Sequence, residues 1–550
     1  MLNLDIVKWP DDVAGAYRAA GLWRGGNLAD AVDDHAATRP DAVAVRGPDT
    51  DLTHVDLTYG DLVDHARTTG ANLVAAGLRA GDRVLVQVAN TWRFVPLLLA
   101  CLRRGVVPVM CLTGHREREL THLADLTRAR AILVTADVRG VDHLALARRV
   151  VAGSCLEQAL DIDDVVPRAG SSARAVTEGG AGHGPGGEDP AVLLLSGGTG
   201  GLPKAICRTH DDYGYNARTA AGVCGVSRST VYLAVLPLGH NFPLACPGIL
   251  GVLGAGGTVV VSPSPRPEVC FELVRRYGVT MTALVPTVAQ RWLDHVGQDP
   301  ASRGDLDSLR LLQVGGSRLA DSVARRIGPE LGCALQQVFG MAEGLINMTR
   351  LDDPDDVVTR TQGRPMSGHD ELRILDEDGA AVADGAPGLL LTRGPYTPRG
   401  YVNAAAYNRE AFTPDGWFRT GDVVRRRRDG NLVVEGRDKD IINRGGEKIS
   451  AEDVEDLAYR CPAVLHAAAV AVPDASLGER VCLAVVPREG RTVTLEDIHT
   501  EMRAAGAART KYPDKLHVVD AFPLTGVGKI DKKALRLRFA PTREEERSTP

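Results

Sequence analysis

The sequence predicts an α/β protein with a large N-terminal domain and a small α+β C-terminal domain. Helix and strand patterns alternate from Tyr59 onwards, and after about Arg437 short charged hairpins replace this alternation. The chain has 550 residues, which is more than a single hydrophobic core of roughly 250 to 300 residues accommodates. We therefore place the domains at residues 1–437 and 438–550.

The first predicted elements form a βαβ series. Apolar residues recur with a helical period over 59–78 and 93–105, whereas the apolar runs at 83–88 and 106–112 have the length of buried strands. Such alternation is typical of a mostly parallel sheet covered by helices. Further strands are expected at 191–195, 231–236, 258–261, 281–285 and 309–314.

Two segments lack the composition of a packed core. Residues 168–189 are rich in Gly, Ser and Ala and almost without large apolar groups, so they cannot offset the entropy of ordering. We expect a flexible surface loop there. The final ten residues, PTREEERSTP, are expected to be frayed.

The composition argues against several classes of protein. A net charge of −6 at pH 7 is unlike the basic surface of a nucleic-acid-binding protein. No apolar run reaches about 18 residues, and the first residues do not resemble a signal peptide. The ten cysteines form no CxxC pair and are expected to be reduced thiols. We expect a cytoplasmic monomer or homodimer that binds neither nucleic acid nor membrane.

A glycine-rich loop follows the strand at 191–195, in the segment LLLSGGTGGLPKAICRTH (193–210). It is not a P-loop, because Lys204 follows a proline and precedes an alanine, and Pro203 stands where a dinucleotide fingerprint has its third glycine. Small residues let backbone N–H groups approach an anion, which favours a polyphosphate over a plain turn. The expected phosphate contacts are Ser196, Gly197, Gly198, Thr199, Gly200 and Lys204.

Four later segments follow this loop in order: QVFGMAEG (337–344), GWFRTGD (416–422), GRDKDIINRGGEKIS (436–450) and PLTGVGKIDKKALR (523–536). Together with the loop they resemble the motif series of the adenylate-forming superfamily over nearly the whole chain. The resemblance implies a β-barrel-like subdomain at the end of the large domain and a mobile C-terminal domain. It also implies ATP and Mg²⁺, and attack of a carboxylate on the α-phosphate to give an acyl adenylate and pyrophosphate.

The same resemblance implies a role for individual residues. Lys529 matches the adenylation lysine, Glu343 the Mg²⁺ ligand, and Asp422 and Arg437 the ribose contacts. Lys439 matches the hinge. The remaining nucleotide positions are Gly315, Gly316, Ser317, Val338, Phe339, Gly340, Met341 and Val434, and the loop for the thioester step is marked by Gly445, Gly446 and Lys448.

Within the superfamily, LPLGHNFPLACPGILGVLGAGG (236–257) and CRTHDDYGYN (207–216) resemble the aryl-acid AMP ligases of siderophore and aryl-capped peptide pathways. Such an enzyme is an acid–thiol ligase. The resemblance places His240 at the site as a catalytic residue. The residues implied to line its aryl pocket are His240, Asn241, Phe242, Cys246, Gly315, Val338, Gly340 and Ile346.

The pocket residues indicate which acid is bound. The amide of Asn241 can bond an ortho hydroxyl or amine, and leaving a buried amide unpaired is costly. The Cys246 thiol is a poor hydrogen-bonding group for a 3-hydroxyl, and Ile346 adds bulk. We predict salicylate first, 2,3-dihydroxybenzoate second, and anthranilate or a 3-substituted analogue such as 3-hydroxypicolinate third.

No carrier-like segment follows Lys529, so the acceptor is expected in trans. It would be the phosphopantetheine thiol of an aryl carrier protein, with free coenzyme A as the alternative. Two other functions stay open: an acyl-CoA synthetase with a long apolar tunnel, and an inactive binding homologue. An inactive homologue would be expected to lose Lys529, Glu343 or Asp422, and all three are present.

Overall fold

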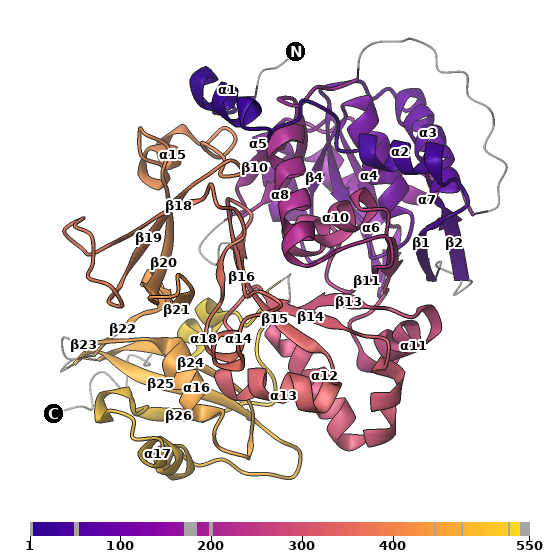
Figure 1. Ribbon diagram of the computed structural model, residues 1–550. Helices are drawn as coiled ribbons and strands as arrows, with labels where there is room; N and C mark the ends of the chain where they lie inside the picture. Colours follow the sequence, from indigo (N-terminus) through magenta and orange to yellow (C-terminus); the bar gives the residue numbers. More distant parts are fainter. Residues whose placement is uncertain are drawn as a thin grey trace.

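The computed structural model describes residues 4–48, 54–169, 184–196, 202–444, 447–474, 477–525 and 529–539, without the side chains of Lys439, Glu447 and Lys448. Within these ranges the chain forms a large α/β part followed by a smaller C-terminal α+β part (Figure 1). This arrangement confirms the predicted fold class. Most of the expected loop at 168–189 and the final ten residues lie outside the described residues.

The larger sheet of the N-terminal part has the strand order β17-β16-β15-β14-β13-β11-β12-β1-β2. Its central strands are parallel, and β2, β16 and β17 are antiparallel to their neighbours. The bounds are β1 Val43–Pro48, β2 His54–Thr58, β11 Val231–Ala234, β12 Thr258–Val261, β13 Met281–Leu284, β14 Leu311–Gly315, β15 Ala334–Met341, β16 Gly344–Met348 and β17 Arg364–Pro365.

A second sheet has the order β10-β9-β4-β3-β5-β8 and is parallel except for β10. Its strands are β3 Arg83–Gln87, β4 Val107–Met110, β5 Ala131–Val134, β8 Gln158–Asp161, β9 Pro190–Leu195 and β10 Ala205–Thr209, and a small ribbon pairs β6 Asp137–Val138 with β7 Val141–Asp142. The strands expected from the sequence are all present. β14 begins two residues later than expected because Leu309 still belongs to a turn, in which its N–H donates to Leu306 O.

Helices cover both faces of these sheets. α3 ends at Ala75 because Gly77 adopts a positive φ of 84° two residues later. The helices are α1 Asp11–Ala19, α2 Asp30–Thr38, α3 Tyr59–Ala75, α4 Phe94–Arg104, α5 Glu117–Thr127, α6 His143–Ala152, α7 Ile162–Val165, α8 His210–Val223, α9 Asn241–Ala245, α10 Gly248–Gly254, α11 Pro267–Tyr277, α12 Pro286–Gln298, η1 Pro300–Leu306, α13 Asp321–Leu331, α14 Asp355–Arg360 and α15 Ala405–Ala411.

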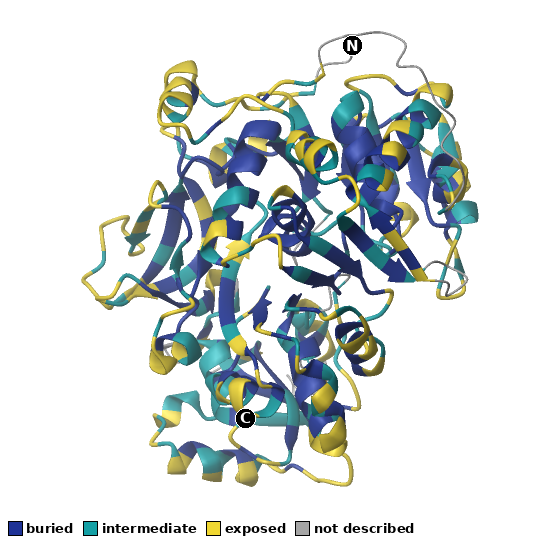
Figure 2. Ribbon diagram, turned by 45° about the vertical axis from the view of Figure 1, so that its right-hand side comes forward, coloured by how far each residue is buried: buried dark blue, intermediate teal, exposed yellow. Residues whose placement is uncertain are grey.

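The main hydrophobic core lies between the two sheets. It joins inward residues of β3 and β9 to Tyr232 and Leu233 of β11 through helices such as α3 and α4. Alternate residues of the six-stranded sheet, such as Leu85, point instead into a second core under α5 and α6. Figure 2 shows these buried layers in dark blue, with exposed residues on the outer surfaces of the helices. No helix of the described residues is long and apolar enough to cross a membrane.

The expected barrel-like part is an open antiparallel sheet in the order β18-β19-β20-β21, which links the large part to the C-terminal part. After it the chain passes through η2 into a sheet flanked by α16 and α17 on one face and α18 on the other. The bounds are β18 Glu371–Leu375, β19 Pro387–Arg393, β20 Phe418–Arg426, β21 Leu432–Arg437, η2 Asp438–Asp440, β22 Ile442–Arg444, β23 Glu447–Ile449, α16 Ala451–Ala458, β24 Val464–Asp474, β25 Gly478–Pro487, α17 Leu495–Ala504, η3 Arg509–Lys511, β26 Lys515–Val518 and α18 Lys532–Phe539.

Polar contacts hold the C-terminal part against the large part. Arg318, which follows β14, forms an ion pair of 2.8 Å with Asp456 of α16. Arg488 pairs with Asp294 of α12 at 2.8 Å, and Gln290 of the same helix donates to Leu465 O at 2.7 Å. Burial raises the pKa of Asp456 to about 8, and Arg318 opposes that rise. These contacts determine where the C-terminal residues meet the large sheet.

Candidate active site

A cavity of about 240 Å³ lies where the C-terminal part meets the ends of β14 and β15 and the hairpin of β20 and β21. Residues of both parts line it, including Thr525 and Lys529 from the segment before α18. The sequence-predicted nucleotide residues that line this cavity are Gly316, Ser317, Val338, Phe339, Gly340, Met341, Asp422, Val434, Arg437 and Lys529.

The Lys529 side chain reaches across the domain junction. Its Cε lies 3.2 Å, and its Nζ 3.8 Å, from the position a Cβ would take on Gly316, whose φ of 90° is one that favours glycine. The backbone N–H of Thr525 donates to Lys529 O at 2.7 Å. Burial and Arg437 lower the pKa of Lys529 to about 8, against the attraction of Asp422 and Glu343.

Asp422 and Arg437 face each other across the β20–β21 ladder. Arg437 Nε donates to Asp422 Oδ1 at 2.7 Å, and Asp422 is only 3% exposed. Burial raises the pKa of Asp422 to about 6, although Arg437 opposes this. The second oxygen, Oδ2, has no hydrogen-bond partner among the described residues. A buried acceptor beside a cavity can accept a hydrogen bond from a ligand hydroxyl.

Glu343 lies in the turn between β15 and β16. Tyr401 donates its hydroxyl to Glu343 Oε1 at 2.7 Å, and the Glu343 charge raises the pKa of Tyr401 in addition to burial. The same carboxylate also acts on the pKa values of Asp422, Arg437 and Lys529. No group of three or more His, Cys, Asp or Glu side chains among the described residues could hold a metal ion. A magnesium ion held by Glu343 would take its other oxygen ligands from water or from a bound phosphate.

Two hydrogen bonds between Ser196 and Lys204 join the two ends of the glycine-rich loop. Ser196 N–H donates to Lys204 O at 2.9 Å, and Lys204 N–H donates to Ser196 Oγ at 3.1 Å. The ammonium of Lys204 lies 3.9 Å from the ring centroid of Tyr407 and 5.6 Å from that of Tyr401. The predicted phosphate contacts Gly197, Gly198, Thr199 and Gly200 lie outside the described residues.

The residues predicted to bind the aryl acid gather around the end of β14. Gly315 pairs with Val338, and Gly340 pairs with Ile346. A Cβ on Gly315 would lie 2.6 Å from Val338 O and 3.2 Å from the ring of Phe242, so no larger residue fits. We call the group formed by His240, Asn241, Phe242, Cys246, Gly315, Val338, Gly340 and Ile346 the acid slot.

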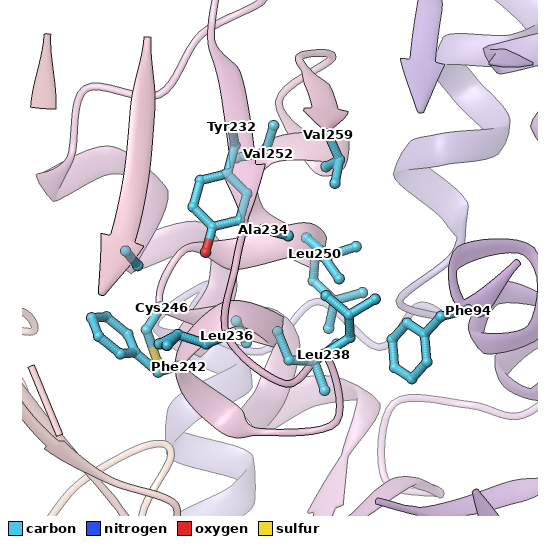
Figure 3. Packing of buried hydrophobic residues seen from close by; sticks show 14 of the residues in the cluster. Phe94, Tyr232, Ala234, Leu236, Leu238, Phe242, Cys246, Leu250, Val252 and Val259 are labelled. Carbon is cyan, nitrogen blue, oxygen red and sulfur yellow. The ribbon is translucent and has the colours of Figure 1, made fainter. Parts of the chain in front are cut away.

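The segment between β11 and α10 contains four residues of the acid slot. His240 caps α9 by accepting the N–H of Phe242 on Nδ1 at 3.3 Å. Burial and the nearby Lys529 charge lower the pKa of His240 to about 3, so the imidazole is neutral at pH 7. Figure 3 shows the side chains of Phe242 and Cys246 close together, with the hydroxyl of Tyr232 turned to their side of its ring. Among the described slot residues, only Val338 and Gly340 line the 240 Å³ cavity.

The predicted hinge and thioester-step loop are described only in part. Lys439 lies in η2, directly after β21, and its side chain is not among the described ones. Lys448 belongs to β23, which pairs with β22, and its side chain is likewise not described. Gly445 and Gly446 lie outside the described residues.

Three tyrosines near the site were missed in the sequence analysis. Tyr401 and Tyr407 contact Glu343 and Lys204, and Tyr213 of α8 donates its hydroxyl to Asn241 Oδ1 at 2.9 Å. Neither the position nor the spacing of Tyr401 and Tyr407 in the sequence indicates these contacts. Tyr213 lies inside the quoted segment 207–216, but its spacing from Asn241 carries no signal.

Two family models match the chain. The model described as AMP-binding enzyme matches residues 32–402, and the model described as AMP-binding enzyme C-terminal domain matches residues 453–529.

Several curated proteins are similar over almost their full length. A Streptomyces protein named salicylyl-CoA synthase / salicylate adenylyltransferase is 53% identical, over 98% of each chain. A Streptomyces carzinostaticus protein named 2-hydroxy-7-methoxy-5-methyl-1-naphthoate–CoA ligase is 50% identical, over 96% of each chain. The salicyl-AMP ligase / salicyl-S-ArCP synthetase of Mycobacterium tuberculosis is 46% identical, over 96% of this chain and 94% of that protein.

A solved structure supports the same relationship. The apo structure of MbtA from Mycobacterium smegmatis is 44% identical in sequence and superposes with a TM-score of 0.71. The match covers 97% of this chain and 99% of that one. The order of both domains is thus shared with the solved protein.

The unpartnered oxygen of Asp422 leads to a prediction about ATP. Asp422→Ala is expected to weaken ATP binding by about 2 kcal/mol, roughly thirtyfold, because hydrogen bonds to a charged group contribute roughly 1.5 to 3 kcal/mol. Isothermal titration calorimetry measures this loss. Asp356→Ala is the matched control, since it removes an exposed carboxylate paired with Arg427 at 3.3 Å. Equal affinity of both variants for ATP would contradict the assignment.

Proposed function

The chain belongs to the AMP-binding enzyme family, and from this premise we propose that it activates an aryl carboxylic acid, salicylate first, as its AMP ester. The observation that carries the proposal is that Lys529 and the Asp422–Arg437 pair line one cavity. The charge of Glu343 acts on the pKa values of all three residues. Asp422 and Arg437 are proposed to hold the ribose, and Phe339 and Gly340 the adenine.

The residues of the acid slot support the proposal that the substrate is an aromatic acid with an ortho hydroxyl. Its walls are apolar at Phe242 and Ile346, and Asn241 supplies the one amide. Salicylate and the 2-hydroxynaphthoate named for one relative share a hydroxyl next to the carboxylate. Burial raises the pKa of the Cys246 thiol to about 12, so the thiol stays neutral and suits an unsubstituted ring carbon. We keep 2,3-dihydroxybenzoate as the second substrate and anthranilate or 3-hydroxypicolinate as the third.

In the proposed reaction an oxygen of the acid attacks the α-phosphorus of ATP, and the bond between the α-phosphorus and the oxygen that bridges to the β-phosphorus breaks. Aryl-AMP forms and pyrophosphate leaves with the bonding electron pair. The Lys529 ammonium lies near His240 of the slot and near Asp422 of the nucleotide side, so it can neutralise charge on both substrates. Glu343 is the residue proposed to hold Mg²⁺, which would supply positive charge to offset the phosphates of ATP. The neutral His240 cannot supply charge, so we propose that it orients the acid.

The product is proposed to pass to a phosphopantetheine thiol. This group is common to carrier proteins and coenzyme A, and the relatives' names include both acceptors. We propose an aryl carrier protein in trans. The domains are proposed as 1–437 and 438–550, turning at Lys439 to withdraw Lys529 and bring in the loop that contains Gly445, Gly446 and Lys448.

The proposal is tested by ATP–pyrophosphate exchange with salicylate, 2,3-dihydroxybenzoate, anthranilate, benzoate and octanoate. Salicylate should give the highest kcat/KM. Exchange with octanoate alone would exclude the aryl assignment and favour the acyl-CoA synthetase, and exchange with none of the acids would favour the inactive homologue. Salicylate transfer to purified aryl carrier protein or to coenzyme A then separates the two acceptors.

The position of Lys529 predicts that the two half-reactions respond differently to its removal. Lys529→Ala should reduce adenylation at least a hundredfold, since one aimed donor of this kind contributes about 2.7 to 4 kcal/mol. Transfer of preformed salicyl-AMP to the thiol should retain most of its rate. Lys533→Ala, in the first turn of α18, is the control. Equal loss in both half-reactions would exclude the assigned role.

The pKa shifts predict a bell-shaped pH dependence of kcat/KM for adenylation. Asp422 must be a carboxylate, so activity falls as the pH drops below about 6, and Lys529 must be an ammonium, so activity falls as the pH rises above about 8. Measuring exchange from pH 5 to pH 10 gives both limbs. An alkaline limb that begins only near pH 10 would contradict the buried, charge-coupled lysine.

A further inference from the structure

Tyr213 connects the predicted acid slot to the interior of the large domain. It lies on α8, its side chain is fully buried, and its hydroxyl donates to Asn241 Oδ1 at 2.9 Å. The Asn241 Nδ2 group contacts Cys246 Sγ at 3.5 Å. The carbonyl oxygen of the amide is therefore occupied from the α8 side, while Nδ2 keeps a further N–H to donate.

A buried ion pair supports Tyr213 in this orientation. The guanidinium of Arg208 lies 4.7 Å from the Tyr213 ring centroid. Arg208 Nε donates to Asp212 Oδ1 at 2.6 Å, with both side chains inaccessible to solvent, and Arg208 Nη1 donates to Ala342 O at 3.1 Å. Burial raises the pKa of Tyr213 well above its ordinary value, so its hydroxyl remains a donor. The ring thus has little freedom to release Asn241.

The two candidate ortho groups differ in what they offer to the amide. The hydroxyl of salicylate donates to its own carboxylate, which leaves oxygen lone pairs free to accept. The amine of anthranilate is a donor whose lone pair is delocalised into the ring, so it is a poor acceptor. An Asn241 that presents an N–H to the slot pairs with the hydroxyl and leaves the amine facing another donor.

We propose that Tyr213 is a positioning residue for acid selection, which holds the Asn241 amide so that an N–H faces the ortho substituent and an ortho-hydroxy acid is preferred over an ortho-amino acid. This inference rests on the proposed function. It adds to the proposed function a residue outside the slot. This residue determines whether the substrate meets the N–H or the oxygen of the Asn241 amide.

The test substitutes Tyr213→Phe, which removes the hydroxyl and keeps the ring on Arg208. Without its partner the amide can turn, so the ratio of kcat/KM for salicylate to that for anthranilate should fall about tenfold, the effect of one oriented hydrogen bond. The loss should appear mainly as a higher KM for salicylate, with kcat within about twofold of the original. A general structural defect would lower kcat for both acids together.

Tyr215→Phe is the matched control. Tyr215 lies on the same helix, is also buried, and shares a hydrogen bond of 2.7 Å with Ser367 Oγ rather than with Asn241. Its acid ratio should stay unchanged. An unchanged ratio in Tyr213→Phe, or an equal change in both variants, would overturn the proposal. Thermal unfolding of each variant shows whether the fold is kept.

A second variant tests the orientation without altering Tyr213. Asn241→Asp keeps an acceptor for the tyrosine hydroxyl but presents an oxygen to the slot, so the preference should shift towards anthranilate by about tenfold or more. A retained preference for salicylate would also overturn the proposal. Failure of the proposed function is a separate result, because the unaltered protein would then catalyse exchange with neither acid.

Discussion

The Lys529 ammonium is the group on which the relation between the two domains depends. It is taken out of water at a junction where two carboxylates attract it and one guanidinium repels it, and its pKa falls to about 8. The carboxylates of Asp422 and Glu343 offset the cost of burying this charge. Both belong to the large domain. The ion pairs of Arg318 with Asp456 and Arg488 with Asp294 hold the C-terminal domain in the orientation that brings the lysine there. A rotation of that domain would break these contacts together.

The predicted acid slot is built differently, because the contacts that support its residues lie within the large domain. Gly315 and Gly340 bring backbone close to Phe242 and Ile346, and no side chain larger than hydrogen fits at Gly315. Tyr213 of α8 donates its hydroxyl to Asn241 Oδ1, and the guanidinium of the fully buried Arg208–Asp212 pair lies against the Tyr213 ring. The residues predicted to bind the acid are therefore supported within the large domain, whereas the Lys529 cation comes from the C-terminal domain. This division would suit the proposed reaction, in which the acid stays in place while the Lys529 charge is withdrawn.

The parts of the fold and site that could be predicted depend on short-range patterns. Strands such as β3 and β11 were found because a buried strand needs a continuous apolar run, and the Asp422 and Lys529 motifs were found because their neighbours in sequence are distinctive. Tyr213 and Tyr401 were missed because each contacts a residue 28 or 58 positions away. No periodicity relates such pairs. The charged state of His240 was equally out of reach, because burial, a property of the folded chain, lowers its pKa.

The sequence by itself determined the α/β class and the two-part organisation, which follow from apolar periodicity. Through the resemblance of its motifs to a known family it also pointed to Lys529, Asp422 and Glu343. Only the tertiary structure decided how those groups act on one another. It set the pKa values of Lys529 and Asp422, the neutral state of His240 and the orientation of the Asn241 amide. The physical reason is that desolvation and hydrogen-bond direction depend on which distant segments pack around a group, and that packing exists only once both sheets and the C-terminal domain have assembled.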